Sequence, residues 1–424
     1  MNKRDQQILA IALPAIVTNI TVPLLGLVDT AIVGHMGSAA YIGAVAVGSM
    51  IFNLVYWLFG FLRMGTSGMT AQACGRRDFN EITRLLVRSG WVSLTIALLI
   101  VVLQWPIREG MLWFIGPTDD VRPLAATYFD IVVWGAPAML SLYSLSGWFI
   151  GMQNTRIPML VSIMQNVVNI LASLTFVYGL GMKVEGVALG TVVAQYAGCM
   201  MALWCLWRYY RKVLGLRGQS FHRSSLTAYF SSNRDIFLRT LCLVAVNLYF
   251  TSAGARQGAT ILAVNTLLMQ LYLLFSYILD GFAYAGEALG GKYWGAKEMD
   301  TYKDIVRRLF GWGTLMTILF TAIYVIGGTP FLSILTDEPQ VVEASKAYVW
   351  WAYLIPAAGV AAFIWDGLFI GTTQTRGMLV SSAVAALVFF VTATVTMNIM
   401  GNHGLWLSMI LYLLTRGIIQ TLIR

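Results

Sequence analysis

Long apolar stretches alternate with short polar segments along the whole 424-residue chain. About 20 apolar residues in a helix cross the ~30 Å hydrocarbon layer of a membrane, and most of these stretches reach that length. Because no water satisfies backbone groups inside a bilayer, we predict that the stretches are helices. The two-residue alternation of a membrane β-barrel is absent. We expect twelve membrane-spanning helices, with approximate boundaries at 8–33, 41–73, 83–105, 124–150, 157–180, 187–209, 234–254, 260–292, 304–328, 342–370, 377–399 and 404–423.

Two ten-residue segments of the chain are nearly identical and lie 220 positions apart. Gly147–Arg156 reads GWFIGMQNTR and Gly367–Arg376 reads GLFIGTTQTR, with six identical positions. Gly75 and Gly295 keep the same spacing. This repeat predicts two similar halves of six helices each, an arrangement typical of secondary transporters.

An even number of helices per half means that both halves enter the membrane from the same side. The predicted fold is therefore an all-α integral membrane protein with two six-helix bundles, related by a pseudo-two-fold axis along the membrane normal. We expect the amino-terminal bundle at 1–210, a polar cytoplasmic linker at 211–232 and the carboxy-terminal bundle at 233–424.

Composition supports a membrane protein. Hydrophobic residues make up 58% of the chain and charged residues 11%, with a mean hydropathy of +0.72. Soluble domains carry about 25% charged residues. The net charge of +9 follows topology, because basic residues gather on one side of the predicted helices, including the cluster from Arg208 to Arg239 and Arg416. An excess of this kind marks the cytoplasmic side. We expect a bacterial cytoplasmic (inner) membrane protein with both termini inside and no nucleic-acid partner.

The sequence offers no pattern for an enzyme or a metal site. The three histidines are far apart, and no HExxH motif is present. The cysteines show no paired spacing, so we interpret them as packing residues with no disulfide, metal or cofactor role. They are Cys74, Cys199, Cys205 and Cys242.

Five charged residues lie well inside the predicted membrane spans, away from their ends: Asp29, Arg63, Asp280, Glu287 and Asp366. A charge near the centre of a bilayer costs at least about 2.5–3.5 kcal/mol. Such a residue is retained when it faces a water-filled cavity or meets a partner. Each is therefore a candidate functional residue, with a structural ion pair or a side chain that snorkels from a span end as the alternatives.

Asp29 lies in NITVPLLGLVDTAIVG, Asn19 to Gly34, six residues after Pro23. Proline removes a backbone donor and allows the helix to bend. Burial disfavours the charged carboxylate, whereas water or a cation favours it. Asp29 therefore has the properties of a protonation switch.

In the fifth span, Asn166, Asn169 and Ser173 share one helical face, and Thr191 lies near the start of the sixth span. Short polar groups commonly hold membrane helices together, so packing is the alternative to an ion site.

In the second half, Asp280 and Glu287 are seven residues apart and are expected to face the same way, while Asp366 precedes the repeated motif. These carboxylates could bind a cationic substrate, form a second cation site, carry protons or pair with Arg63.

Several segments resemble the DinF (DNA-damage-inducible protein F) branch of the MATE family of multidrug and toxic compound extrusion transporters. They are NITVPLLGLVDTAIVGHMG, LDGFAYAGEA, WDGLFIGTTQTR and GNHGLWL, and the resemblance covers essentially the whole chain. It implies two six-helix bundles around a central cleft and export of organic compounds, coupled to entry of H⁺ or Na⁺.

The resemblance also implies that Asp29 is the coupling residue, acting with a fifth-helix Asn, a carboxylate four positions later and a sixth-helix Thr. Asn169 and Thr191 match this pattern, but Ser173 replaces the second carboxylate. The change favours H⁺ over Na⁺, although a weak Na⁺ site at Asp29, Asn169 and Thr191 stays open. Coupling through the carboxylates of the second half stays open as well.

We therefore expect a proton-coupled antiporter that exports small organic amphiphiles by alternating access and works as a monomer in the lipid bilayer. Protonation of Asp29 would bend the first helix. The main rival function is a flippase for lipids or lipid-linked precursors, which could use the same two-bundle cleft.

Overall fold

The computed structural model describes residues 2–34, 38–214, 223–335 and 338–424, and within these ranges the chain is helical and contains no strand. Eleven helical segments among the described residues are long and apolar enough to cross a membrane. Together with α1 (Lys3–Gly34), some of whose side chains lie outside the described set, they account for the twelve expected spans.

The described residues form two compact units. Unit 2 is Val17–Leu226, and unit 1 combines Met1–Ile16 with Thr227–Arg424. Helix α1 therefore contributes its first residues to one unit and its remainder to the other. In unit 1 the start of α1 is held by an ion pair between Asp5 and Arg308 at 2.8 Å.

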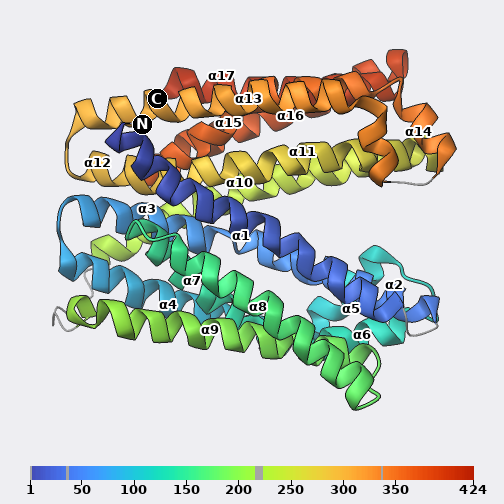
Figure 1. The fold of residues 1–424 in the computed structure, drawn as a ribbon, viewed down its shortest axis with the longest axis horizontal. Helices are drawn as coiled ribbons and strands as arrows, with labels where there is room; N and C mark the ends of the chain where they lie inside the picture. The colour runs from blue at the N-terminus through green and yellow to red at the C-terminus, as the bar shows by residue number, and fades with distance from the viewer. Residues whose placement is uncertain (1, 35–37, 215–222, 336–337) are drawn as a thin grey trace. The chain divides into compact units, whose positions relative to one another are not determined.

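Unit 2 contains most of the first predicted half, and its helices α8 and α9 pack along each other (Figure 1). The third span is followed by a short helix, α5, that the apolar pattern did not predict, because its 12 residues are too few to cross a membrane. The elements after α1 are α2 (Ala39–Leu58), α3 (Phe61–Gly75), α4 (Phe79–Val102), α5 (Gln104–Ile115), α6 (Arg122–Val132), the 3₁₀ turn η1 (Val133–Gly135), α7 (Ala136–Gly151), α8 (Arg156–Leu174), the π-helical segment η2 (Thr175–Gly179) and α9 (Val184–Leu214).

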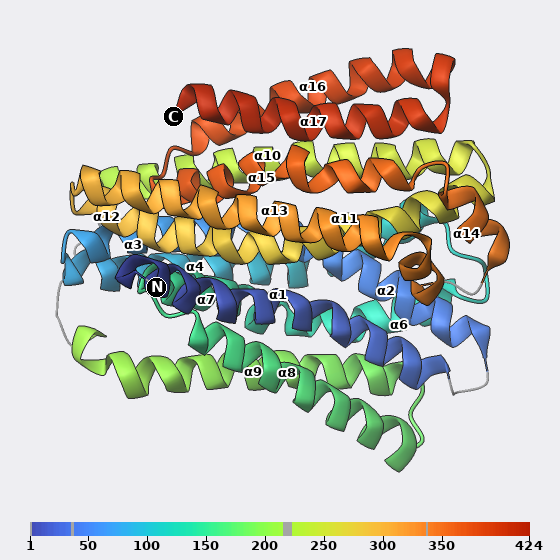
Figure 2. The same ribbon diagram turned by 45° about the horizontal axis from the view of Figure 1, so that its top comes forward.

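Unit 1 contains the second predicted half, in which α16 and α17 run side by side (Figure 2). The tenth predicted span, 342–370, is divided in the structure between α14 and α15. The elements are α10 (Arg223–Arg256), α11 (Ala259–Ala285), the π-helical segment η3 (Gly286–Gly290), α12 (Gly291–Gly295), α13 (Met299–Leu335), α14 (Pro339–Ser345), α15 (Val349–Gly371), α16 (Thr375–Met400) and α17 (Asn402–Ile423).

The helices extend into the predicted linker from both sides. Helix α9 continues to Leu214, and α10 begins at Arg223. The remaining linker residues, 215–222, lie outside the described residues.

The repeated motif packs one helix closely against another in both units. Gly147 and Gly151 form a Gly-x-x-x-Gly pattern on α7, and Gly367 and Gly371 form the same pattern on α15. Gly151 packs against the carbonyl oxygen of Ser67, and Gly371 packs against that of its counterpart 220 residues later, Glu287. Glycines with this spacing let two membrane helices approach backbone to backbone. The repeat predicted from the sequence is thus confirmed in the backbone.

The residues after these glycines end their helices in matching turns. Gln153 and Thr373, again 220 positions apart, have φ angles of 66° and 56°. In each turn two amide groups return to carbonyl oxygens of the preceding helix, as in Asn154 N to Phe149 O at 2.9 Å. This is the Schellman arrangement, which usually takes glycine at the left-handed position. Arg77 and Lys297 form a second pair of the same kind, with φ angles of 57° and 61°.

Candidate functional site

Asp29 is buried within unit 2, with 3% of its surface exposed. Its carboxyl group lies within interaction range of the Thr191 and Asn169 side chains. Its Oδ1 atom has no hydrogen-bond partner among the described residues. The first helix therefore carries an acidic group to the fifth and sixth spans, an arrangement that the family resemblance implied.

Helices α8 and α9 supply the polar groups opposite Asp29. Asn169 and Ser173 lie one turn apart on α8, and both are fully buried. The Asn169 Nδ2 atom donates to Thr191 Oγ1 at 3.2 Å, and the Thr191 hydroxyl lies 3.1 Å from the carbonyl oxygen of Val187. The structure thus brings three of the four predicted coupling residues into direct proximity.

Ser173, the fourth residue, packs against the start of α9. A Cβ atom added to Gly190 would lie 2.2 Å from the Ser173 Oγ atom, so glycine is needed beside this side chain. Ser173 Oγ and Asn169 Oδ1 both lack a hydrogen-bond partner within the described part of the chain. The cluster therefore holds a single carboxyl group and several buried oxygen atoms that can accept a hydrogen bond or contact a cation.

A neighbouring tyrosine belongs to the same cluster. The buried Tyr128 on α6 interacts electrostatically with Asp29, and its hydroxyl lies 3.4 Å from Ser49 Oγ. The ring is seated on α2, because a Cβ atom on Gly48 would lie 2.2 Å from it. Sequence reasoning missed Tyr128, since one tyrosine among 19 carries no positional signal.

Asn166, which shares the α8 face, has a structural contact. Its Nδ2 atom donates to the carbonyl oxygen of Thr21 at 3.0 Å, and the Thr21 hydroxyl lies 3.0 Å from that of Ser162. These bonds fasten α8 to α1 two turns from Asp29. They fix the helix that carries the acid against the helix that faces it.

Asp366 is enclosed by basic residues of unit 1. Its Oδ2 atom accepts hydrogen bonds from Arg239 and Arg416, and its Oδ1 atom accepts one from Gln420 at 2.6 Å. All four side chains are buried. The group contains two positive charges and one negative charge, so Asp366 is neutralised within its own unit.

This cluster corrects one assignment from the sequence. Arg63 was the single base expected well inside a span, and the charge pattern used Arg239 and Arg416 only to assign the cytoplasmic side. Arg239 and Arg416 are also buried among the helices, 7% and 2% exposed, on α10 and α17. The charge pattern shows only how close a basic residue lies to the end of a predicted span. It could not show that Asp366, on another helix, pairs with these two arginines.

The other carboxylates of unit 1 differ in environment. Asp280 is half-buried and accepts a hydrogen bond from Ser276 at 3.3 Å, whereas Glu287 is 1% exposed and lies in the π-helical segment η3. Tyr272 interacts electrostatically with Asp280 and with both arginines of the Asp366 cluster. Asp280 therefore lies at the edge of that cluster, while Glu287 occupies a helix-packing position beside Gly371. Arg63, in unit 2, is half-buried on α3.

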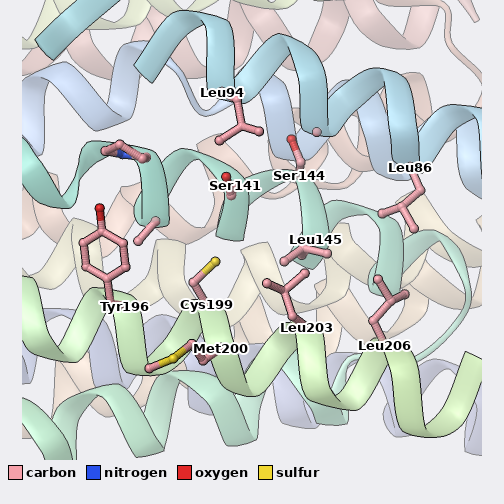
Figure 3. Close-up of a pocket in the computed structure, with 13 residues that line it drawn as sticks. Leu86, Leu94, Ser141, Ser144, Leu145, Tyr196, Cys199, Met200, Leu203 and Leu206 are labelled. Atoms are coloured by element: carbon pink, nitrogen blue, oxygen red, sulfur yellow. The ribbon is translucent and has the colours of Figure 1, made fainter. Parts of the chain in front are cut away.

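A separate hollow of about 440 Å³ lies in unit 2 between α4, α7 and α9 (Figure 3). Its lining is mostly apolar, with Leu94, Leu145 and Leu203 among the residues that surround it. None of the predicted site residues lines it. An apolar lining of this kind can accommodate a hydrocarbon group, whereas the side chains of the Asp29 cluster are polar.

The four cysteines are free thiols in the described structure. Cys199 faces the apolar hollow in Figure 3, and Cys205 is buried one and a half turns further along α9. Both positions agree with their interpretation as packing residues.

Known proteins resemble the chain in both sequence and fold. The MatE family model matches residues 14–176 and 236–395. DNA damage-inducible protein F of Escherichia coli K12 is 38% identical over 424 residues, an alignment that covers 99% of this chain and 91% of that protein. A probable multidrug resistance protein NorM of Thermotoga maritima is 23% identical over 358 residues, covering 80% and 74% of the two chains.

The fold is similar to that of the MATE transporter VcmN of Vibrio cholerae in its bent form. The TM-score is 0.88 at 17% sequence identity, over 99% of this chain and 95% of that one. The family match extends through both halves, and the relative from Escherichia coli aligns almost from end to end. The chain therefore belongs to the MATE family of multidrug efflux transporters, in the branch of DNA damage-inducible protein F.

Proposed function

We propose that this protein exports small organic amphiphiles in exchange for protons that bind at Asp29. The observation that carries the proposal is a buried carboxyl group, 3% exposed, whose Oδ1 atom has no hydrogen-bond partner among the described residues. A buried acid without a fixed counter-charge can alternate between a neutral and a charged form as water or a proton reaches it. Asp366, by contrast, is held by two arginines.

The neighbouring groups favour H⁺ over Na⁺. The cluster offers one formal negative charge, since the position four residues after Asn169 is a serine. Desolvating a metal cation is costly, and a single carboxylate with neutral oxygens compensates for it only in part. A proton needs no such coordination shell. Thr191 can accept a hydrogen bond from protonated Asp29, because its own hydroxyl hydrogen is within reach of Val187 O.

Helix α1 provides the moving element of the proposed cycle. It remains helical through Pro14 and Pro23, two positions where the regular backbone hydrogen bond is missing. Neutralising Asp29 would change the interactions that hold the second part of α1 to α8 and α9. Protonation would then bend α1 and release the substrate, and loss of the proton to the other side would reset the helix. Coupling of this kind requires the proton to bind more tightly to one conformation of the protein, with α1 bent or unbent, than to the other.

The proposal also covers the other charged residues, the oligomeric state and the location of the protein. We propose that half-buried Asp280 and Arg63, together with buried Glu287, contact the substrate or a second cation. We propose that the protein works as a monomer in the bacterial cytoplasmic membrane, with both termini in the cytoplasm and a polar linker joining the two halves.

Transport in proteoliposomes tests the function. Purified protein is reconstituted, a proton or sodium gradient is imposed, and efflux is measured for matched cationic and anionic amphiphiles. We expect efflux to follow the proton gradient in the wild type and to fall to the level of empty liposomes in Asp29→Asn. Asp300→Asn, an exposed carboxylate on α13, serves as the control and should retain wild-type efflux. Proton-driven exchange at the wild-type rate by folded Asp29→Asn would refute the assignment.

A further inference from the structure

A hollow of about 840 Å³ lies at one end of unit 1, where α10 begins, α15 turns into α16 and α17 ends. Its lining combines apolar side chains, such as Leu379 and Val380, with polar and charged ones that include Ser231, Ser232, Arg234, Asp235, Thr375 and Arg376. None of these residues belongs to the Asp29 cluster or to the Asp366 cluster. We call this hollow the α10–α16 pocket.

The charge of the pocket suits an anion. Arg376 is exposed and has no ion-pair partner within the described ranges, whereas Arg234 pairs with the buried Asp235 at 3.0 Å. Asp235 also accepts a hydrogen bond from Thr375 at 3.3 Å. Two arginines and one aspartate leave one uncompensated positive charge, together with four hydroxyl groups from serine and threonine.

The backbone adds further donors at the same place. Helix α16 starts at Thr375, and its N-cap residue Gln374 makes no side-chain capping bond. The first amide groups of a helix lack intrahelical partners and favour phosphate groups, as does the positive end of the helix dipole. Arginine beside such amides is the usual partner of a phosphate oxygen.

The surface that leads away from the pocket is apolar. Val380, Val384, Leu387 and Val391 lie on one face of α16, and each is at least 39% exposed. Helix α10 lies beside α16, as shown by the contact of Tyr249 with Phe390 at 5.3 Å between ring centroids. The α10–α16 pocket, with its arginines and hydroxyl groups, thus continues through Val380 into an exposed apolar stripe on a membrane-spanning helix.

We propose that the α10–α16 pocket binds the phosphate headgroup of an anionic phospholipid, whose acyl chains lie along the exposed face of α16. The Arg376 guanidinium, Arg234 and the amino end of α16 hold the phosphate. A soluble anion would use the same polar groups and would gain nothing from the apolar stripe.

Native mass spectrometry of the full-length protein tests this site. Protein purified in detergent is titrated with phosphatidylglycerol or phosphatidylcholine, and retained lipid is counted. We expect the wild type to retain phosphatidylglycerol preferentially, and Arg376→Gln and Arg234→Gln each to weaken this retention about fivefold, as for one basic group near a lipid surface. Thermal unfolding of each variant confirms that the fold is intact.

The repeat provides a matched control. Arg156 occupies the position 220 residues before Arg376, follows the same Thr, and is also exposed. Arg156→Gln should leave retention unchanged. Equal loss in Arg156→Gln and Arg376→Gln would overturn the proposal, as would equal retention of the two lipids. Displacement of phosphatidylglycerol by equimolar inorganic phosphate would also overturn it, by assigning the pocket to a soluble anion.

Discussion

Gly367 lies directly against the backbone of Ala283: a Cβ atom on Gly367 would be 2.1 Å from the Ala283 carbonyl oxygen. The counterpart of this contact, 220 residues earlier, joins Gly147 to Arg63 with a corresponding distance of 2.3 Å. No side chain fits at either glycine unless the two helices separate. The glycines of the duplicated motif therefore let two helices meet backbone to backbone in each unit.

We expect Gly367→Ala and Gly147→Ala each to destabilise the protein by about 1–3 kcal/mol, because a methyl group would be forced into packed backbone. Gly311→Ala is the control, since nothing lies within 4 Å of the added Cβ on that α13 glycine. Thermal unfolding in detergent measures the difference. Equal midpoints for Gly367→Ala and Gly311→Ala would contradict the proposed packing role.

Asp366→Asn should be strongly destabilising, because Arg239 and Arg416 would stay buried without their carboxylate. Removing one partner of a buried ion pair costs roughly 3–5 kcal/mol. Asp120→Asn, an exposed loop carboxylate, should leave the unfolding midpoint unchanged. Replacing Asp366, Arg239 and Arg416 together by apolar residues of similar size should recover most of the loss. A normal midpoint for Asp366→Asn alone would show that the cluster does not stabilise unit 1.

Ser173→Asp should make transport respond to sodium, because it places a second carboxylate beside Asp29 and Asn169. Ser173→Asn has the same size without the charge and should give no such response. Efflux in proteoliposomes with a sodium gradient and no proton gradient distinguishes the two. The tight contact with Gly190 requires that folding of both variants be checked first. If folded Ser173→Asp remains indifferent to sodium, the missing carboxylate does not decide the coupling ion.

Tyr128→Phe should lower proton-driven efflux about three- to tenfold while leaving the fold intact. The ring still fills the space above Gly48, and only the hydroxyl that interacts with Asp29 is lost. The magnitude corresponds to one hydrogen bond of about 1 kcal/mol. Tyr196→Phe, which loses a hydroxyl bonded to Trp134 O elsewhere in unit 2, should transport normally. Equal rates for the two variants would remove Tyr128 from the site.

Glu109 gives the protein a modest sensitivity to acid. It lies on α5, outside the membrane spans, where a hydrogen bond from Arg122 is the main reason that its pKa falls below the ordinary 4.5. A depressed folded-state pKa contributes stability above the unfolded pKa and loses it as pH falls through the folded value. Glu109→Gln should therefore unfold at a slightly lower temperature at pH 7, and the difference should vanish well below pH 4.5. A constant difference across this range would argue against the pair.

The membrane-spanning helices could be predicted because a bilayer imposes their length and apolar character. The span expected at 377–399 is observed as Thr375–Met400, for example. Short helices outside the hydrocarbon layer carry no such constraint, so α5 was not predicted and α14 was merged with the following span.

The place of a candidate site could be predicted where a charged residue, costly to bury in a membrane, stood alone in an apolar run, as Asp29 does. The prediction was weaker where the partners came from other helices. Arg239, Arg416 and Tyr128 acquire their roles only when α10, α17 and α6 pack against a carboxylate that is distant in the sequence. The sequence alone does not show which residues of two such helices lie opposite each other.

The matching turns at Gln153 and Thr373 bear on how such a transporter could be redesigned. The residue 220 positions after Asp29 is Tyr249, so the two halves share these turns while the side chain at the candidate site differs. A proton-binding site could therefore be introduced into the other half by exchanging side chains, because the helix ends and turns are already equivalent. The turns at Gln153 and Thr373 would not need to be changed.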